Sequence, residues 1–199
     1  MRTKKKAKPK KRPYNNSTRT AKSSQTQLEI IEALVHILAE KRGGEVQIQE
    51  IADKTGITKR TIFRFFKDKK SLHEAMDEYL LSYLSAGVKQ LGNYDFVGFG
   101  KNAIRTFEEN EPITIAYVLS PLGQEARIIF RKKLNELMME KIAAEKKIKI
   151  TKGNVPRLAL IVNLVNAKIW YDLKTEHQLT GKEIEEAMGW GLESLLRNL

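Results

Sequence analysis

Apolar residues recur at helical spacing along almost the whole sequence from residue 24 onward. In the first such segment they are Leu28, Ile31, Leu34, Val35 and Leu38. This spacing places them on one face of a helix with 3.6 residues per turn. No segment has the strict apolar and polar alternation of a strand, and no internal repeat is present. The sequence therefore predicts an all-α fold of about nine helices.

Capping motifs divide this helical sequence into segments. The overlapping capping boxes Ser24-x-x-Gln27 and Thr26-x-x-Glu29 predict a first helix that begins near Ser24. Other helix starts are predicted at N-capping residues and at prolines, which favour the first helical turn. These are Asp68 for the fourth helix, Asp95 for the fifth, Ser120-Pro121 for the seventh, Pro156 for an eighth that reaches about His177, and Thr180 for the last.

The sequence between Val46 and Lys69 predicts two short helices joined by a tight turn. Gly56 lies in the turn, where a positive φ costs a glycine little. Ala52 is small, so the two helices can approach closely, and Ile57 and Ile62 are placed to pack the turn onto the first of them. Together these constraints are those of a helix-turn-helix.

The second short helix presents hydroxyl and basic side chains outward: Thr58, Lys59, Arg60, Thr61 and Arg64. Hydroxyl groups suit phosphate oxygens, and arginine or lysine suits phosphates or the O6 and N7 atoms of guanine. The alternative is a basic surface turn in an ordinary helical bundle, which the small residue, the glycine and the basic face together disfavour. We therefore expect the chain to bind double-stranded DNA.

The segment from Gln27 to Leu72 resembles the DNA-binding domain of the TetR family of bacterial and archaeal regulators. The matching residues are Ile51-Ala52, Gly56-Ile57-Thr58, Thr61-Ile62-Phe63, Phe66, Lys69 and Leu72. The resemblance covers about a quarter of the chain. It implies an all-α dimer whose C-terminal domain binds a small effector and whose common output is repression.

By position, the resemblance also implies which side chains contact DNA. It assigns the DNA backbone to Thr61, Phe63 and Lys69, and the bases to Lys59, Arg60 and Arg64. Phe63 stands where tyrosine is commonest in the family, and phenylalanine cannot donate a hydrogen bond to phosphate. Phe65 and Phe66 are expected to pack in the core instead.

Positive charge is concentrated at the N-terminus. Residues 1–22 contain ten of the 36 lysines and arginines and none of the 24 acidic residues, so the rest of the chain is nearly neutral. We expect residues 1–23 to be a disordered basic tail, followed by a DNA-binding domain over residues 24–70. The tail is interpreted as an arm that binds a polyanion, with a purely solubilising tail as the alternative.

The remaining region, residues 71–199, is expected to form a homodimer. Its last two predicted helices carry rows of apolar residues, from Leu158 to Trp170 and from Ile184 to Leu195. So wide an apolar surface needs burial on more than one side. The resemblance implies a bundle with a second subunit, whereas cover by helices five to seven of the same chain is the alternative. Asn163 and Asn166 interrupt the first row and are interpreted as interface residues rather than ligand contacts.

The same region is expected to bind a small apolar or aromatic effector. A pocket for such a molecule needs aromatic walls with few polar groups. The candidate ligand-binding residues are Phe99, Phe107, Tyr117, Phe130 and Trp170.

Signs of catalysis, metal binding or membrane insertion are weak. The chain has no cysteine, no glycine-rich phosphate loop and no HExxH motif. His73 and Asp77 have a spacing suited to a metal, but no third ligand follows, so a solvated helix face is expected. No apolar run is long enough to span a membrane and no signal peptide is visible. We expect no enzymatic activity, no metal, no cofactor and a cytoplasmic location.

The sequence thus favours a sequence-specific transcriptional regulator that binds a palindromic operator as a homodimer, most simply a repressor released by a small molecule. The second hypothesis is an architectural DNA-binding protein without an effector, for which the tail supplies general affinity.

Overall fold

Ten α-helices and no strand make up the described part of the chain. The computed structural model describes residues 16–120 and 124–199, with side chains over residues 20–120 and 128–199. The helices are α1 (Asn16–Glu40), α2 (Ile48–Thr55), α3 (Lys59–Phe65), α4 (Lys69–Lys89), α5 (Phe96–Glu109), α6 (Glu111–Leu119), α7 (Gln124–Lys146), α8 (Val155–Leu164), α9 (Ala167–Thr175) and α10 (Gly181–Arg197). A 3-10 turn, η1 (Gln90–Gly92), follows α4. The all-α prediction is confirmed, with one helix more than expected.

The extra helix arises because the predicted eighth helix is broken in its middle. Val165 has φ −78° and ψ 74°, and the Asn166 amide donates to the Leu164 carbonyl at 2.9 Å, which closes an inverse γ-turn. The Asn166 carboxamide then accepts from the Lys168 amide at 2.9 Å and caps α9. An asparagine that bonds to the local backbone competes with helix continuation, so α8 and α9 point in different directions.

The first helix begins earlier than its capping boxes predict. It starts at Asn16 rather than Ser24, so the expectation of a disordered tail is wrong for residues 16–23, and residues 1–15 lie outside the described part. The Thr26 hydroxyl donates to the Lys22 carbonyl one turn back at 3.0 Å, instead of capping. Residues 16–23 contain neither glycine nor proline, and extending an existing helix costs far less than starting one.

The caps predicted at Asp68 and Thr180 are confirmed, and Asp95, where the fifth helix was expected to start, is also a cap. The Asp68 carboxylate accepts from the Ser71 amide at 2.8 Å, and the Asp95 carboxylate accepts from the Gly98 amide at 2.7 Å. At the start of α10, the Thr180 amide donates to the Glu183 carboxylate at 2.8 Å. Ser120 ends α6, whereas the Pro121 expected to start the seventh helix lies outside the described residues.

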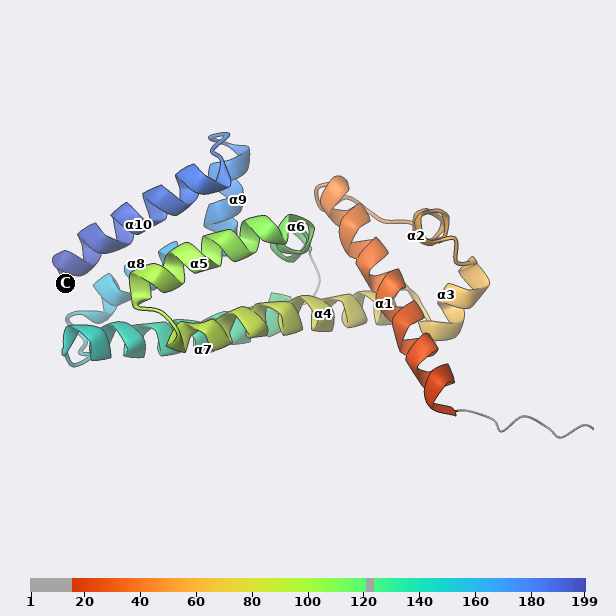
Figure 1. Cartoon of the computed structure of the whole chain (residues 1–199), viewed down its shortest axis with the longest axis horizontal. Coiled ribbons are helices and arrows are strands. Elements are labelled where there is room, and N and C mark those ends of the chain that lie inside the picture. The colour runs from red at the N-terminus through yellow and green to blue at the C-terminus, as the bar shows by residue number, and fades with distance from the viewer. Residues whose placement is uncertain (1–15, 121–123) are drawn as a thin grey trace, which may run out of the picture.

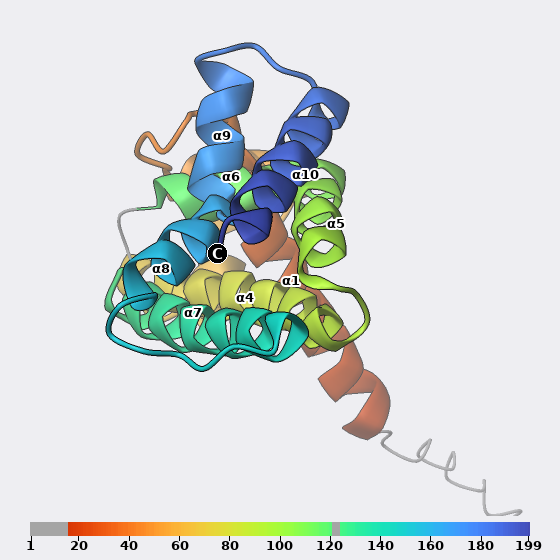
Figure 2. The same ribbon diagram turned by 90° about the vertical axis from the view of Figure 1, so that its left-hand side faces the viewer.

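The helices are arranged as two groups joined by one long helix. In Figure 1, α1, α2 and α3 lie at one end, α5 to α10 lie at the other, and α4 runs from the first group into the second. The turned view in Figure 2 shows α10 beside α5, and these two helices are in extensive contact. Helix α6 packs on α1, so the two groups also touch away from α4.

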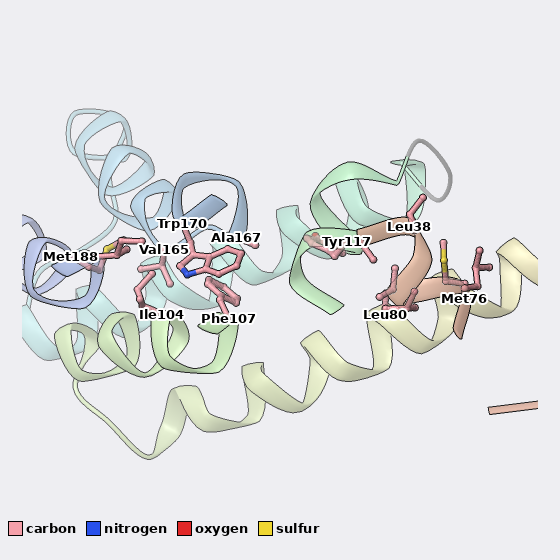
Figure 3. Packing of buried hydrophobic residues seen from close by; sticks show 14 of the residues in the cluster. Leu38, Met76, Leu80, Ile104, Phe107, Tyr117, Val165, Ala167, Trp170 and Met188 are labelled. Carbon is pink, nitrogen blue, oxygen red and sulfur yellow. The ribbon is translucent and has the colours of Figure 1, made fainter. Parts of the chain in front are cut away.

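One hydrophobic core runs through both groups. Figure 3 shows Leu38, Met76 and Leu80 at one end of this core, with Phe107, Trp170 and Met188 at the other. The Phe107 and Trp170 ring centroids are 6.3 Å apart, a separation typical of packed aromatic pairs. None of the described helices combines the length and apolarity that a membrane span requires.

Candidate nucleic-acid interface and ligand cavity

The turn between α2 and α3 has the geometry that its sequence predicts. Gly56 adopts a left-handed conformation with φ 70°, and its amide donates to the Ala52 carbonyl at 2.9 Å. Ile51 and Ile62 are fully buried on either side of the turn. Helix α2 thereby packs against both α1 and α3, which confirms the helix-turn-helix.

The start of α3 is fixed by two threonines. The Thr58 hydroxyl oxygen accepts from the Thr61 amide at 3.3 Å and lies 3.1 Å from the Thr61 hydroxyl. The cap satisfies an amide that would otherwise lack an intrahelical partner. Thr58 is exposed and Thr61 is partly buried, so both lie at the edge of the exposed α3 surface.

The basic side chains of α3 face solvent. Lys59, Arg60 and Arg64 are exposed, and none of them forms an ion pair with any described residue. The Arg64 guanidinium lies 5.1 Å from the centre of the Phe65 ring. Phe63 is 48% exposed, which is unusual for an aromatic side chain with no partner to cover it.

Three other lysines of this region are already paired. Three ion pairs join α1, α2, α4 and the loop after α1: Lys41 with Glu50 at 2.7 Å, Lys54 with Glu40 at 2.7 Å, and Lys69 with Glu45 at 2.8 Å. The hydrogen bond and charge of Lys69 lower the pKa of Glu45. The pairs neutralise the flanks and leave uncompensated positive charge on α3.

Lys69 therefore differs from the other predicted DNA contacts. It is partly buried and held by Glu45, so a phosphate would compete with that carboxylate. Lys67, which the sequence argument left out, is exposed and has no ion-pair partner among the described residues. Its position just after α3 adds it to the same basic surface.

Phe66 is 6% exposed and packs in the core, and Phe65 is partly buried against it. The packing predicted for both aromatic residues is confirmed. Phe63 is thus the aromatic side chain of α3 that is left at the surface.

Comparison with known families supports this assignment. The family model described as bacterial regulatory proteins, tetR family, matches residues 30–76. Residues 30–76 form a TetR-family domain. The match runs from the buried face of α1 through the helix-turn-helix to the buried Met76 of α4. The chain is therefore a DNA-binding transcriptional regulator with its DNA-binding domain near the N-terminus. Neither the curated proteins nor the solved structures that were compared include a match.

Behind the TetR-family domain, the helical bundle forms a partly open cavity of about 60 Å³. Its walls come from α4, α5, α6, α7 and the α8–α9 junction. Four of the five predicted ligand-binding residues line it: Phe99, Phe107, Tyr117 and Phe130. The fifth, Trp170, is fully buried behind Phe107, and its indole N–H donates to the Glu108 carboxylate at 3.0 Å. Trp170 supports the wall and does not form it.

Five polar residues that line the cavity were not among the predicted ligand contacts: Tyr83, Asn102, Thr106, Arg131 and Asn166. Arg131 of α7 and Asn166 of the α8–α9 junction both line it. Asn166 was interpreted as an interface residue, but its side chain caps α9 within one chain. Asn163 is exposed, and its side-chain amide donates to the Ala159 carbonyl at 2.8 Å.

The apolar rows of the C-terminal helices are mostly buried within a single chain. Leu158, Trp170, Ile184 and Leu192 are fully buried, and the helices that carry them pack on α5, α6 and α7 of the same chain. The large apolar side chains that remain exposed on the described parts of α7, α8 and α10 are Ile128 at 67%, Ile129 at 71%, Leu137 at 39%, Val155 at 38%, Leu160 at 58% and Trp190 at 74%. The surface available to a second subunit is thus smaller than the sequence pattern suggested.

His73 does not lie on the solvated face expected for it. It is partly buried, and its Nδ1 atom has no hydrogen-bond partner among the described residues. Burial, and then the charge of Lys69, lower the pKa of His73. No cluster that could hold a metal ion is found in the described part of the chain.

Proposed function

We propose that this chain is a transcriptional repressor that binds a palindromic operator as a homodimer and leaves it when a small effector binds. The observation that carries the proposal is the charge pattern around α3. Its exposed basic residues and Lys67 lack ion-pair partners among the described residues, whereas the nearby Lys41, Lys54 and Lys69 are paired. Unpaired charge on a recognition helix is free to neutralise phosphates and to contact base edges.

The side chains of α3 then have different tasks. Lys59, Arg60 and Arg64 point into solvent and are proposed to reach bases or phosphates in the major groove. Thr58 and Thr61 sit at the N-terminus of α3, where amides and hydroxyls suit phosphate oxygens. The exposed Phe63 and the paired Lys69 are proposed to lie against the backbone of the DNA.

A second subunit is needed because one helix-turn-helix reads one half-site. We place the interface on α8 and α10, which contact each other and expose Leu160 and Trp190. Large exposed side chains of this kind mark interaction surfaces when they gather on neighbouring elements. Ile128 and Ile129 of α7 extend the apolar surface, since α7 packs against α8.

Coupling between ligand and DNA is proposed to pass through α4 and α6. Both helices line the cavity, α4 with Tyr83 and Leu84 and α6 with Tyr117. Both also contact α1, which carries the DNA-binding helices. We place the boundary between the DNA-binding domain and the ligand-binding domain at residues 70 and 71, in the first turn of α4. A ligand that shifts α4 or α6 would therefore change the position of α3.

Selection of bound duplexes from a random pool, followed by affinity measurement on the selected operator, tests the proposal. Lys59→Ala and Arg60→Ala are each expected to lower operator affinity by about 1–3 kcal/mol and to relax sequence preference at one position. Lys132→Ala, which removes an exposed lysine on α7, is the control and should leave affinity unchanged. Equal affinity for operator and scrambled DNA would instead indicate an architectural DNA-binding protein.

A further inference from the structure

The cavity contains one charged side chain. Its described lining includes no aspartate, no glutamate and no other basic residue beside Arg131. The Arg131 side chain is partly buried. One of its terminal nitrogens donates to the Val165 carbonyl at 3.2 Å, and the other lies 3.5 Å from the Asn163 carboxamide oxygen. A guanidinium has five N–H donors, so several remain for a further acceptor.

The charge of Arg131 has no counterion within the described residues. All ion pairs given by the structure involve other residues. Arg105, by contrast, is exposed and still holds Glu185 with two hydrogen bonds. Burial lowers the pKa of Arg131, against a smaller opposite effect of Tyr117. Withdrawing a charge from water without a partner is costly, so an anion at this position would be bound favourably.

The other walls suit an apolar body with a polar head. Phe99, Phe107 and Leu134 supply aromatic and aliphatic surface. The polar groups of α4 and α5 are mostly satisfied internally, since the Tyr83 hydroxyl donates to the Thr106 carbonyl at 3.0 Å. The Asn102 carboxamide also lines the cavity and makes no hydrogen bond with a described residue, so it is a second polar group that a ligand can engage.

We propose that the effector is a small monocarboxylate, with its carboxylate on the Arg131 guanidinium and its apolar body against Phe99 and Phe107. Arginine binds carboxylates through two parallel N–H donors, which fixes both charge and orientation. The cavity volume of about 60 Å³ favours a short-chain or single-ring acid. The inference narrows the apolar effector expected from the sequence, and it rests on the proposed function of this region as the effector-binding domain.

Calorimetric titration of the full-length protein with butyrate and phenylacetate, each against its neutral amide, tests this assignment. The acids are expected to bind on the order of 10- to 100-fold more tightly than butyramide and phenylacetamide, as charge-assisted hydrogen bonds require. Arg131→Gln should remove this preference and leave amide binding unchanged. Arg131→Lys, which keeps the charge but loses the two-donor geometry, should retain part of it.

Arg157→Gln is the matched control, because it removes an exposed arginine from α8 and leaves the cavity intact. Circular dichroism of each variant separates loss of binding from loss of folding. Equal affinity for acid and amide, no binding of either acid, or an acid preference that survives in folded Arg131→Gln overturns the proposal.

A separate measurement of DNA affinity with and without the acid distinguishes this inference from the proposed function. An acid that binds through Arg131 but leaves operator affinity unchanged supports the ligand class and refutes release by an effector.

Discussion

Two glycines with left-handed backbones differ in what surrounds them, and this difference predicts the cost of replacing each. Gly43, after α1, has φ 83°, and Gly56, in the helix-turn-helix, has φ 70°. A Cβ atom at Gly43 would lie 3.1 Å from the Leu119 Cβ and 3.2 Å from the Leu119 carbonyl oxygen. A Cβ atom at Gly56 would meet nothing within 4 Å.

The conformational part of the cost is shared by both positions. In this conformation an L-residue lowers the free energy of unfolding by about 1–2 kcal/mol relative to glycine. Alanine also restricts the unfolded chain, which raises the free energy of unfolding by about 0.4–1 kcal/mol. Gly56→Ala should therefore lower the free energy of unfolding by about 1 kcal/mol. In Gly43→Ala the new methyl group also crowds Leu119 of α6, which costs about 1–3 kcal/mol. Its free energy of unfolding should therefore fall by roughly 2–4 kcal/mol.

Urea denaturation followed by circular dichroism measures both losses, and each 1 kcal/mol should also lower Tm by about 2–4 °C in a chain of this size. Asparagine tolerates the left-handed conformation better than alanine does. Gly56→Asn should therefore be close to neutral, whereas Gly43→Asn should remain destabilising. Equal losses for the two alanine variants would refute the argument that α6 presses on the end of α1.

Three further outcomes are expected. Lowering the pH from 7 to 5 should destabilise the wild type more than His73→Gln in thermal unfolding. The pKa of His73 is lowered in the folded chain, so the unfolded chain takes up more protons as the pH falls through the usual histidine pKa of about 6.5. An identical pH dependence of the two proteins would contradict this. Trp190→Ser should weaken the dimer on the order of 30-fold in sedimentation, as loss of a buried interface tryptophan does, whereas Ile150→Ser should not; a monomeric wild type would remove the premise. Residues 1–15 hold eight basic residues and no acid. If they engage about three phosphates, deleting them should make the slope of log K against log salt concentration shallower by roughly 2–3. An unchanged slope would show that these residues do not contact DNA.

The parts of the fold that follow local rules could be predicted from the sequence. Asp68, Asp95 and Thr180 each cap an amide three residues away, so the information lies within one turn. The start of α1 could not be located in this way. A residue that can cap a helix start can instead hydrogen-bond to the preceding turn when it lies inside a helix, as Thr26 does. Which of the two it does depends on whether the residues before it are themselves helical.

The surface of α3 could also be predicted, because exposure on a short helix follows from which residues face its buried neighbour. The pairing of Lys69 with Glu45 could not, since the two residues are 24 positions apart and meet through the loop after α1. The extent of the dimer surface could not be predicted for a similar reason. An apolar row reports how much of a helix is buried, but it does not report whether α5 or a second chain covers it.

The Arg131 guanidinium is held by the backbone of the α8–α9 junction. One feature of the sequence around Arg131 indicates such a contact, although the helical spacing of apolar residues does not. A helix end leaves carbonyls without amide partners, and Arg131 donates to the one at Val165. Lys132, Lys133 and Lys141 of α7 each have a glutamate three or four positions later, as solvated helix faces often do, whereas the positions three and four residues from Arg131 hold no acid. A basic residue without a local counterion, opposite an asparagine in an otherwise apolar helix, indicates a partner across the bundle. The break in the helix thus both fixes the guanidinium and places its charge in the cavity.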